Sequence, residues 1–208
     1  ILCGFGAGEI GAAFLASRAA IEKRISRGKK VLARSERLFD LADAEFGARV
    51  SSVRRALYLL FNEGYHSASV DVTVRADLCG EALRLTFLLL EAPAAAQPET
   101  VALAALMCLL TARVPARLDT SGALNALVDQ DRSTWDARWI DDGLALLNQS
   151  ATGPDITVYH LEAAIAAAHA TAPSVSETNW TAIVRLYDRL MTIAPSPVVA
   201  LNRAIAIG

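Results

Sequence analysis

The sequence contains few of the residues that break helices and almost none of the patterning that builds strands. Glycine and proline account for 12 and 7 of the 208 residues, whereas alanine, the strongest helix former, accounts for 40. Alternation of β-branched and polar residues, which is typical of strands, is nearly absent. Hydrophobic residues make up 53% of the chain and charged residues 20%, which excludes a disordered tail. We therefore expect an all-α fold.

Cysteine is also scarce, and no hydrophobic run is long enough for a bilayer. Cys3, Cys79 and Cys108 are odd in number and lie far apart among apolar residues, as reduced, buried cysteines do. The longest uncharged apolar runs, 100–112 and 190–202, fall short of the roughly 20 residues of a membrane-spanning helix. The first residues lack a methionine and the basic start of a secretory signal. We expect no disulfide, no membrane span and a cytoplasmic location, in a chain cut from a longer protein.

Positive charge is concentrated at one end of the chain. Residues 1–37 carry eight basic and three acidic side chains, a balance of +5, although the whole chain has a net charge of −2. Residues 38–208 therefore sum to −7. A compact basic segment joined to an acidic body is typical of a small nucleic-acid-binding module attached to a domain that avoids nucleic acid. The alternative is a helix face that is simply solvated.

Periodicity in the basic segment predicts a helix-turn-helix. Residues 6–15 form a short first helix, and Ser17 is placed to cap a second helix that runs to Arg34. The apolar stripe of the second helix consists of Ile21, Ile25, Gly28 and Leu32. Its basic stripe consists of Lys23, Arg27, Lys30 and Arg34. At ~100° per residue the basic stripe lies about 200° around the helix from the apolar one. One face is thus expected to pack and the other to carry cations.

The same segment also satisfies a dinucleotide-binding pattern. Gly6, Gly8 and Gly11 match G-x-G-x-x-G, and a helix follows them. That fingerprint requires a preceding strand and further alternation of strands and helices. Residues 48–208 show one helical pattern after another, so an NAD(P)-binding enzyme ranks behind the other interpretations.

Three regions follow from these patterns. We expect a helix-turn-helix module at 1–37, an acidic linker at 38–47, and a larger helical bundle or repeat-like domain at 48–208. Its helices are expected near 50–61, 74–89, 98–112, 136–147, 156–170, 179–193 and from 197 onward. Between two of them, 114–135 is expected to be an ordered loop with room for one helical turn. Serine followed by proline at 196–197 predicts a helix start.

No catalytic or metal-binding set is recognisable in the helical domain. The three histidines lack the spacing of metal ligands on one helix face. Asp129 and Asp131 are flanked by Gln130 and Arg132, which favours a hydrogen-bonded loop over a pair of catalytic carboxylates. The three tryptophans are expected to anchor helices. We expect no enzyme activity, no cofactor and no metal.

Several motifs together resemble one protein family. GEIGAAFL (8–15) and KRISRGKK (23–30) resemble the DNA-reading helix-turn-helix in the last conserved region of bacterial extracytoplasmic-function (ECF) RNA polymerase sigma factors. LYLLFNEGY (57–65), DQDR with a following WD (129–136) and PSPVVALNRA (195–204) resemble the subgroup with a long helical C-terminal extension that contains tetratricopeptide-like repeats. The resemblance covers nearly the whole chain, and the three downstream motifs in this order are specific.

The resemblance implies a factor that binds core RNA polymerase and directs it to promoter DNA, with this segment recognising the −35 type element. The residues implied in DNA binding are Ser17, Arg18, Ala20, Lys23, Arg24, Arg27, Lys30 and Arg34. Lys30 and Arg34 are implied to approach phosphates. The extension is implied to regulate activity or to contact a protein partner. The alternative, from a different class, is a helical protein-interaction scaffold that does not bind DNA.

Overall fold

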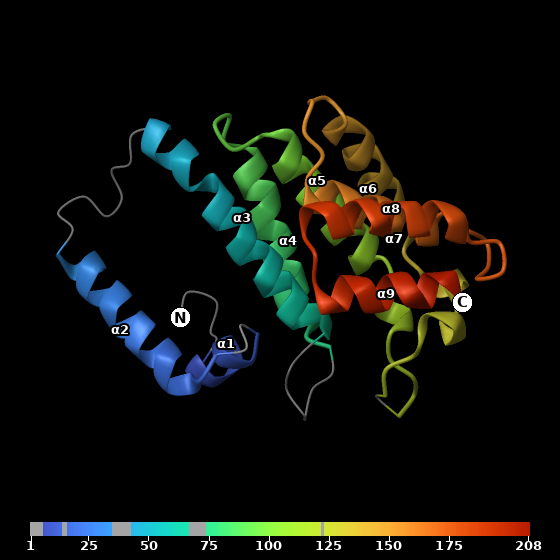
Figure 1. The fold of residues 1–208 in the computed structure, drawn as a ribbon, viewed down its shortest axis with the longest axis horizontal. Coiled ribbons are helices and arrows are strands. Elements are labelled where there is room, and N and C mark those ends of the chain that lie inside the picture. Colours follow the sequence, from blue (N-terminus) through green and yellow to red (C-terminus); the bar gives the residue numbers. More distant parts are fainter. Residues whose placement is uncertain (1–5, 14–15, 35–42, 67–73, 122) are drawn as a thin grey trace. The chain divides into compact units, whose positions relative to one another are not determined.

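The structure is a computed structural model, and it describes residues 6–13, 16–34, 43–66, 74–121 and 123–208 (Figure 1). Across these residues the backbone forms α-helices, turns and short 3-10 helices, and no strand is present. The closest approach to a strand is an isolated antiparallel bridge between Leu118 and Leu124. The expectation of an all-α fold is confirmed.

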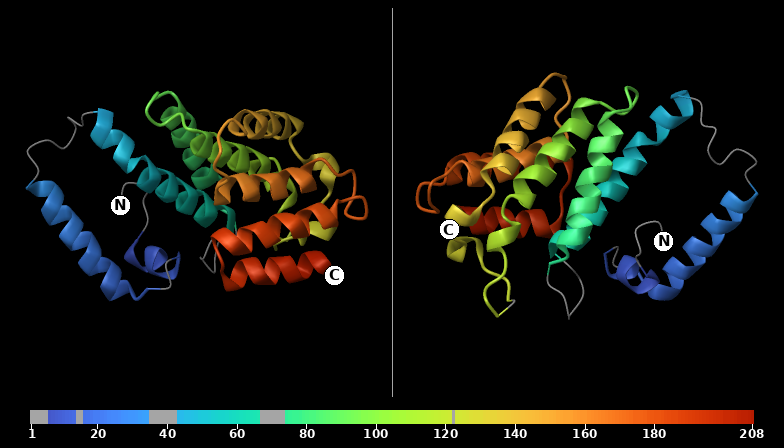
Figure 2. Two further views of the ribbon diagram at one scale, coloured as in Figure 1. Left: turned by 45° about the horizontal axis from the view of Figure 1, so that its top comes forward. Right: turned by 180° about the vertical axis from the view of Figure 1, so that it is seen from behind.

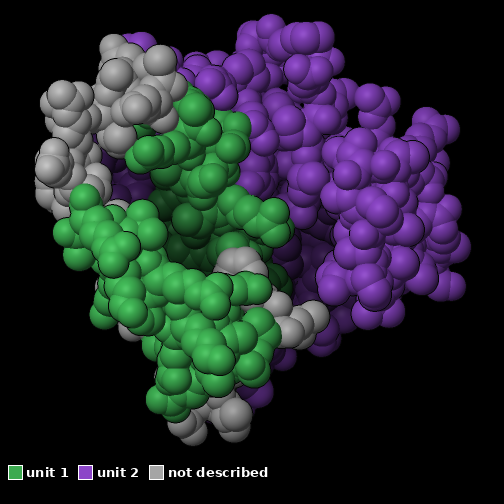
Figure 3. All heavy atoms as spheres, turned by 60° about the vertical axis from the view of Figure 1, so that its left-hand side comes forward, with its two compact units in different colours: residues 1–82 green, residues 83–208 purple. Residues whose placement is uncertain are grey.

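The chain divides into two compact units, Ile1–Ala82 and Leu83–Gly208 (Figure 3). The division falls within a helix, α4 (Ala76–Leu90). It does not fall near residue 47, where the sequence placed the boundary. The N-terminal unit therefore contains more than the expected helix-turn-helix module.

Among its described residues, the N-terminal unit contains three helices in addition to the first half of α4. They are α1 (Ala7–Ala13), α2 (Arg18–Ala33) and α3 (Asp43–His66). Helix α3 begins inside the expected acidic linker, so the linker prediction is wrong from Asp43 onward, while residues 38–42 lie outside the described part of the chain. Asp43 is the first residue of α3, so part of the expected linker is the start of a helix.

Close packing of α3 against α4 depends on a glycine. The helix expected near 50–61 is longer than predicted, because α3 continues through Gly64 to His66. A Cβ on residue 64 would lie 2.8 Å from the backbone nitrogen of Cys79 and 2.9 Å from the carbonyl oxygen of Arg75. The amide of Arg75 donates to the carbonyl oxygen of Gly64 over 2.7 Å. This approach groups α3 with the start of α4.

The C-terminal unit is built around α5 (Pro98–Thr111), which buries ten consecutive residues from Thr100 to Leu109. The other α-helices that lie wholly in this unit are α6 (Ala137–Ser150), α7 (Val158–Ala170), α8 (Trp180–Ile193) and α9 (Pro197–Ile207). Helices α6 and α7 pack on α5, α8 packs on α7, and α9 packs on α8 (Figures 1 and 2). Their starts agree with the predicted positions to within about two residues.

Side chains cap α8 and α9 at their predicted starts. The hydroxyl oxygen of Ser196 accepts from the amide of Val199 over 3.1 Å, and Pro197 is the first residue of α9. The side chain of Asn179 accepts from the amide of Ala182 over 3.0 Å at the start of α8. The predicted helix start at 196–197 is confirmed.

One segment of the described residues is long and apolar enough to cross a membrane, and it lies in the apolar core. That segment is Pro98–Ala116, and 72% of its most apolar window is buried inside the structure, as in a core helix. Cys79 and Cys108 are free and buried as predicted, while Cys3 lies outside the described residues. Burial, with a smaller effect of Asp142, raises the pKa of the Cys108 thiol to about 12, so this thiol stays protonated.

Candidate nucleic-acid interface

A backbone hydrogen bond links α1 to the residues directly before α2. The amide of Ala16 donates to the carbonyl oxygen of Gly11 over 2.8 Å. Gly11 is buried, and a Cβ at this position would lie 2.6 Å from the carbonyl oxygen of Ala16, closer than real Cβ atoms approach. This close contact therefore excludes any side chain at residue 11, and α1 packs on α2.

The same observation bears on the dinucleotide pattern. Gly8 and Gly11 lie within α1. The fingerprint instead needs its glycines in a loop between a strand and a helix, where the backbone can approach a pyrophosphate. Gly11 allows the close contact with Ala16, and nothing lies within 4 Å of a Cβ at Gly8.

The first turn of α2 is capped and carries an ion pair. The hydroxyl oxygen of Ser17 accepts from the amide of Ala20 over 3.3 Å, so the predicted cap is confirmed. Arg18 Nε donates to Glu22 Oε1 over 2.8 Å, one helical turn along. Both side chains are more than half exposed, so the pair adds little stability and is free to exchange for another partner.

Only the start of the predicted apolar stripe is packed. Ile21 is buried and Ile25 is half-buried, but Gly28 is exposed with open space around it, so its expected core position is wrong. The side chain of Leu32 lies outside the described residues. The reason is length: α1 has 7 residues and α2 has 16, which correspond to about 10 Å and about 24 Å of helix. Helix α1 is too short to cover α2.

The opposite face of α2 carries the predicted basic stripe, which we call the cationic ridge. It consists of Lys23, Arg27 and Lys30 of α2 and of Arg34, which directly follows α2, and all four are exposed. Arg24 is exposed beside it, and Ala20 is half-buried near its start. Among the residues that the structure describes, no carboxylate forms an ion pair with these five cations. At ~100° per residue, Arg18 lies about 140° around the helix from Lys23 and so is not part of the ridge.

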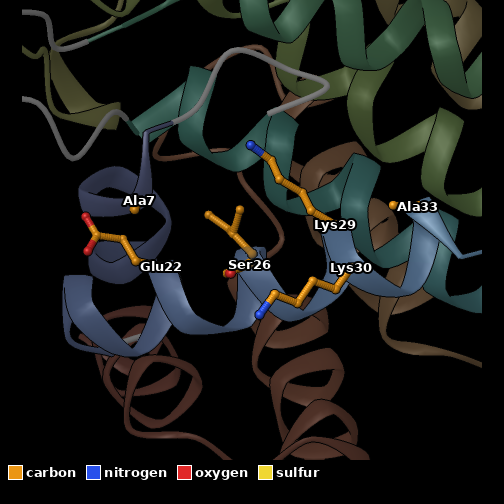
Figure 4. A pocket seen from close by; sticks show the side chains of 7 residues that line it. Ala7, Glu22, Ser26, Lys29, Lys30 and Ala33 are labelled. Carbon is orange, nitrogen blue, oxygen red and sulfur yellow. The ribbon is translucent and has the colours of Figure 1, made fainter.

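An open groove of about 630 Å³ runs beside the ridge. It is lined by Ala7 of α1 and by Glu22, Ile25, Ser26, Lys29, Lys30 and Ala33 of α2. In Figure 4 the side chains of Lys29 and Lys30 leave α2 in different directions. Lys29 belongs to neither predicted stripe and is not among the residues that the family resemblance implies in DNA binding, although it directly precedes Lys30. Ridge and groove together place cations around about half of the circumference of α2.

A second cluster of polar residues lies in the C-terminal unit, in and around the loop 114–135. The described part of this loop contains three short 3-10 helices, where room for one helical turn was expected. They are Val114–Ala116, Leu127–Asp129 and Arg132–Thr134. Arg132 Nη1 donates to the carbonyl oxygens of His169 over 2.5 Å and of Ala172 over 2.7 Å. The guanidinium of Arg132 also lies 4.8 Å from the ring centroid of Trp135.

The acidic side chains of this loop stabilise turns. Asp131 Oδ1 accepts from the amide of Ser133 over 2.9 Å and from its hydroxyl over 2.7 Å, and these bonds hold the pKa of Asp131 below its ordinary value. Gln130 Oε1 accepts from Arg113 Nη2 over 3.3 Å. The predicted hydrogen-bonded loop is confirmed for Asp131 and Gln130.

The histidines have structural partners. His160 completes a capping box with Thr157 at the start of α7. His169 is buried, and its ring lies edge-on to that of Trp180 with centroids 5.4 Å apart. Burial first, then the positive charges of Arg113 and Arg132, lower the pKa of His169 to about 4. Among the described residues no group of three or more potential ligands could hold a metal ion.

Comparisons with known proteins identify similarity without a function. Residues 49–151 match the model of a family of unknown function (DUF6596). An uncharacterized protein of Rhizobium meliloti (strain 1021) is 41% identical over 208 residues, which are 100% of this chain and 49% of that protein. The chain therefore spans about half the length of the curated relative that it matches. No solved structure matches the chain significantly.

Proposed function

We propose that this chain is the DNA-binding and regulatory part of a bacterial RNA polymerase sigma factor of the ECF type. In this proposal α1 and α2 form the helix-turn-helix that recognises promoter DNA at the −35 type element. The whole protein binds core RNA polymerase in the cytoplasm, and the helical C-terminal region regulates activity or contacts a protein partner. No catalysis and no cofactor are involved.

The cationic ridge supports the proposal most directly. Lys23, Arg27 and Lys30 are exposed on one face of α2 and Arg34 is exposed directly after it. Ile21 on the opposite face is buried, and α2 contacts α1. A recognition helix needs this arrangement, because one face must be held by the module while the other enters the major groove. The ridge also has no carboxylate partners among the described residues, so its cations are available to phosphates.

The measurement that tests the proposal is the salt dependence of binding to duplex DNA, read by fluorescence anisotropy with the 208-residue chain. Each neutralised phosphate contributes about −0.9 to the slope of log K against log salt, so four ridge cations predict a slope of about −3 to −4. Failure to bind duplex DNA at low salt, or a slope near zero, would remove the proposal.

The alternative function is a helical protein-interaction scaffold. It is favoured by the exposed apolar side chains of α9 in the C-terminal unit. A scaffold predicts no salt-dependent DNA binding, so the same titration distinguishes the two functions.

A further inference from the structure

Helix α2 carries cations on both sides of the cationic ridge as well as on the ridge itself. At ~100° per residue, Arg24 lies about 100° around α2 from Lys23 in one direction, and Lys29 lies about 120° from Lys23 in the other. Arg24 and Lys29 are both exposed. The ridge is therefore flanked by one exposed cation on each side of the helix.

Lys29 lies on the side of α2 that borders the open groove. It lines this groove together with Ser26 and Lys30 of α2, and α1 contributes Ala7 to the lining. In Figure 4 the side chains of Lys29 and Lys30 point away from α2 in different directions. Because the groove is open, a large anion that binds the ridge can also reach the side chain of Lys29.

Neither flanking cation forms an ion pair with a carboxylate in the part of the chain that the structure describes. Glu22 also lines the groove, but it precedes Lys29 by seven residues, which is about 10 Å along the helix axis. The carboxylate of Glu22 is paired with Arg18 Nε over 2.8 Å. The charge of Lys29 is therefore available to an anion.

We propose that Lys29 and Arg24 contact phosphates on the two opposite walls of the DNA major groove, while Lys23 and Arg27 face the bases between them. This inference rests on the proposed function. The resemblance implies Arg24 in DNA binding but assigns it to no wall, and it does not include Lys29. Lys29 is thus a further positioning residue of the DNA-binding surface.

The dimensions of helix and DNA support this arrangement. An α-helix with its side chains is about 10–12 Å across, and the major groove is about 12 Å wide. A helix that turns one face toward the base edges therefore turns its two flanks toward the two phosphate backbones. Phosphate contacts fix the orientation of a protein on the duplex and carry no sequence information directly. Lys29 and Arg24 are placed to hold α2 from both sides.

The salt dependence of DNA binding tests the two flanking contacts. The probe is a fluorescein-labelled duplex of arbitrary sequence, titrated with the 208-residue chain and read by fluorescence anisotropy. Lys29→Ala should make the slope of log K against log salt shallower by about 0.9, because one phosphate contact is lost. Arg24→Ala should have the same effect, and the double variant should lose about 1.8. Lys29→Arg should keep the slope, because arginine keeps the charge.

A second measurement distinguishes a phosphate contact from a base contact. Duplexes selected by binding from a random-sequence library should show the same preferred bases for Lys29→Ala as for the unmodified chain. Lys23→Ala should instead change the preference at the base that Lys23 contacts. Arg189→Ala is the matched control, because Arg189 is an exposed cation of α8, and it should change neither the salt slope nor the preferred bases.

Two results would overturn the inference and leave the proposed function intact. One is an unmodified chain that binds duplex DNA with a steep salt dependence that either Lys29→Ala or Arg24→Ala leaves unchanged. The other is a change of the preferred bases by Lys29→Ala, which would place Lys29 against a base. A chain that does not bind duplex DNA at low salt removes the proposed function, and the inference falls with it.

Discussion

Helices α2 and α5 are similar in length, with 16 and 14 residues, but they stand in opposite relations to solvent. Helix α5 buries ten consecutive residues and is held by packing on nearly all sides. Helix α2 buries Ile21, exposes every one of its six cations, and is held by a serine cap, an ion pair and contact with the short α1. Most of the surface of α5 is buried against other parts of the fold, whereas the cationic face of α2 remains available to a ligand. Substitutions in the C-terminal unit should therefore change stability, and substitutions on the ridge should change binding.

Loss of the Arg132 side chain should have the largest effect on stability. Arg132→Ala removes two bonds from a guanidinium to carbonyl oxygens and a contact with the ring of Trp135. We expect a loss of about 3 kcal/mol in the free energy of unfolding, measured by urea denaturation, because hydrogen bonds to charged groups are worth about 1.5–3 kcal/mol each. Arg138→Ala, at an exposed arginine of α6, is the control and should cost less than about 0.5 kcal/mol. Equal effects of the two substitutions would mean that the cluster does not stabilise the unit.

Adding a methyl group at the contact between α5 and α6 should have the next largest effect on the free energy of unfolding. Gly143 is buried, and a Cβ there would lie 2.7 Å from Leu109 Cγ and 3.2 Å from the carbonyl oxygen of Ala105. Gly143→Ala should lower the free energy of unfolding by about 1–3 kcal/mol, the usual cost of overpacking a core. A gain in stability would show that α6 can move away from α5 without loss.

The buried histidine should make stability depend on pH. The folded-state pKa of His169 is about 4, below the ordinary 6.5, so between these values the unfolded chain binds more protons than the folded chain. Its contribution is complete above about pH 6.5 and is lost as the pH falls toward about 4. We expect His169→Gln to reduce the fall in unfolding free energy over this window by about 1 kcal/mol, measured by urea denaturation at several pH values. Parallel curves for the two proteins would contradict the assignment.

A methyl group on α2 should have the smallest effect and the opposite sign. Nothing lies within 4 Å of a Cβ at Gly28. Gly28→Ala should stabilise α2 by up to about 1 kcal/mol, the difference in helix propensity between the two residues. Slower amide hydrogen exchange in α2 with unchanged DNA affinity is the expected result. Loss of DNA affinity would indicate that DNA approaches the backbone at Gly28.

Local signals in the sequence were sufficient for most of the fold. The capping pattern at Ser196 and the proline after it predicted the start of α9, and Ser17 predicted the start of α2, because a cap depends only on residues within one turn. The polar loop around Asp131 was predicted to be structural, and its hydrogen bonds agree. The carbonyl groups of His169 and Ala172, which accept from Arg132, could not be predicted as its partners, because they lie far from Arg132 in the sequence.

Features that depend on what packs against a helix were not predictable in the same way. Periodicity placed Gly28 on the apolar stripe, but periodicity cannot show that α1 is too short to reach it. The close approach at Gly64 groups α3 with the start of α4 and has no local signal. At the candidate site, the cationic ridge was found from spacing alone, whereas Lys29 became relevant only when the groove between α1 and α2 was seen.

The most direct test of the claim that α2 binds DNA compares the duplex-DNA affinities of two double variants. Lys23→Ala with Arg27→Ala removes two charges from the ridge, and Arg185→Ala with Arg189→Ala removes two exposed charges from α8. Each ridge contact to a base is worth about 1–3 kcal/mol, so the ridge pair should weaken binding to duplex DNA by at least about tenfold, while the α8 pair should leave it nearly unchanged. Equal affinities for both double variants and the unmodified chain would contradict the claim that α2 is the DNA-binding element.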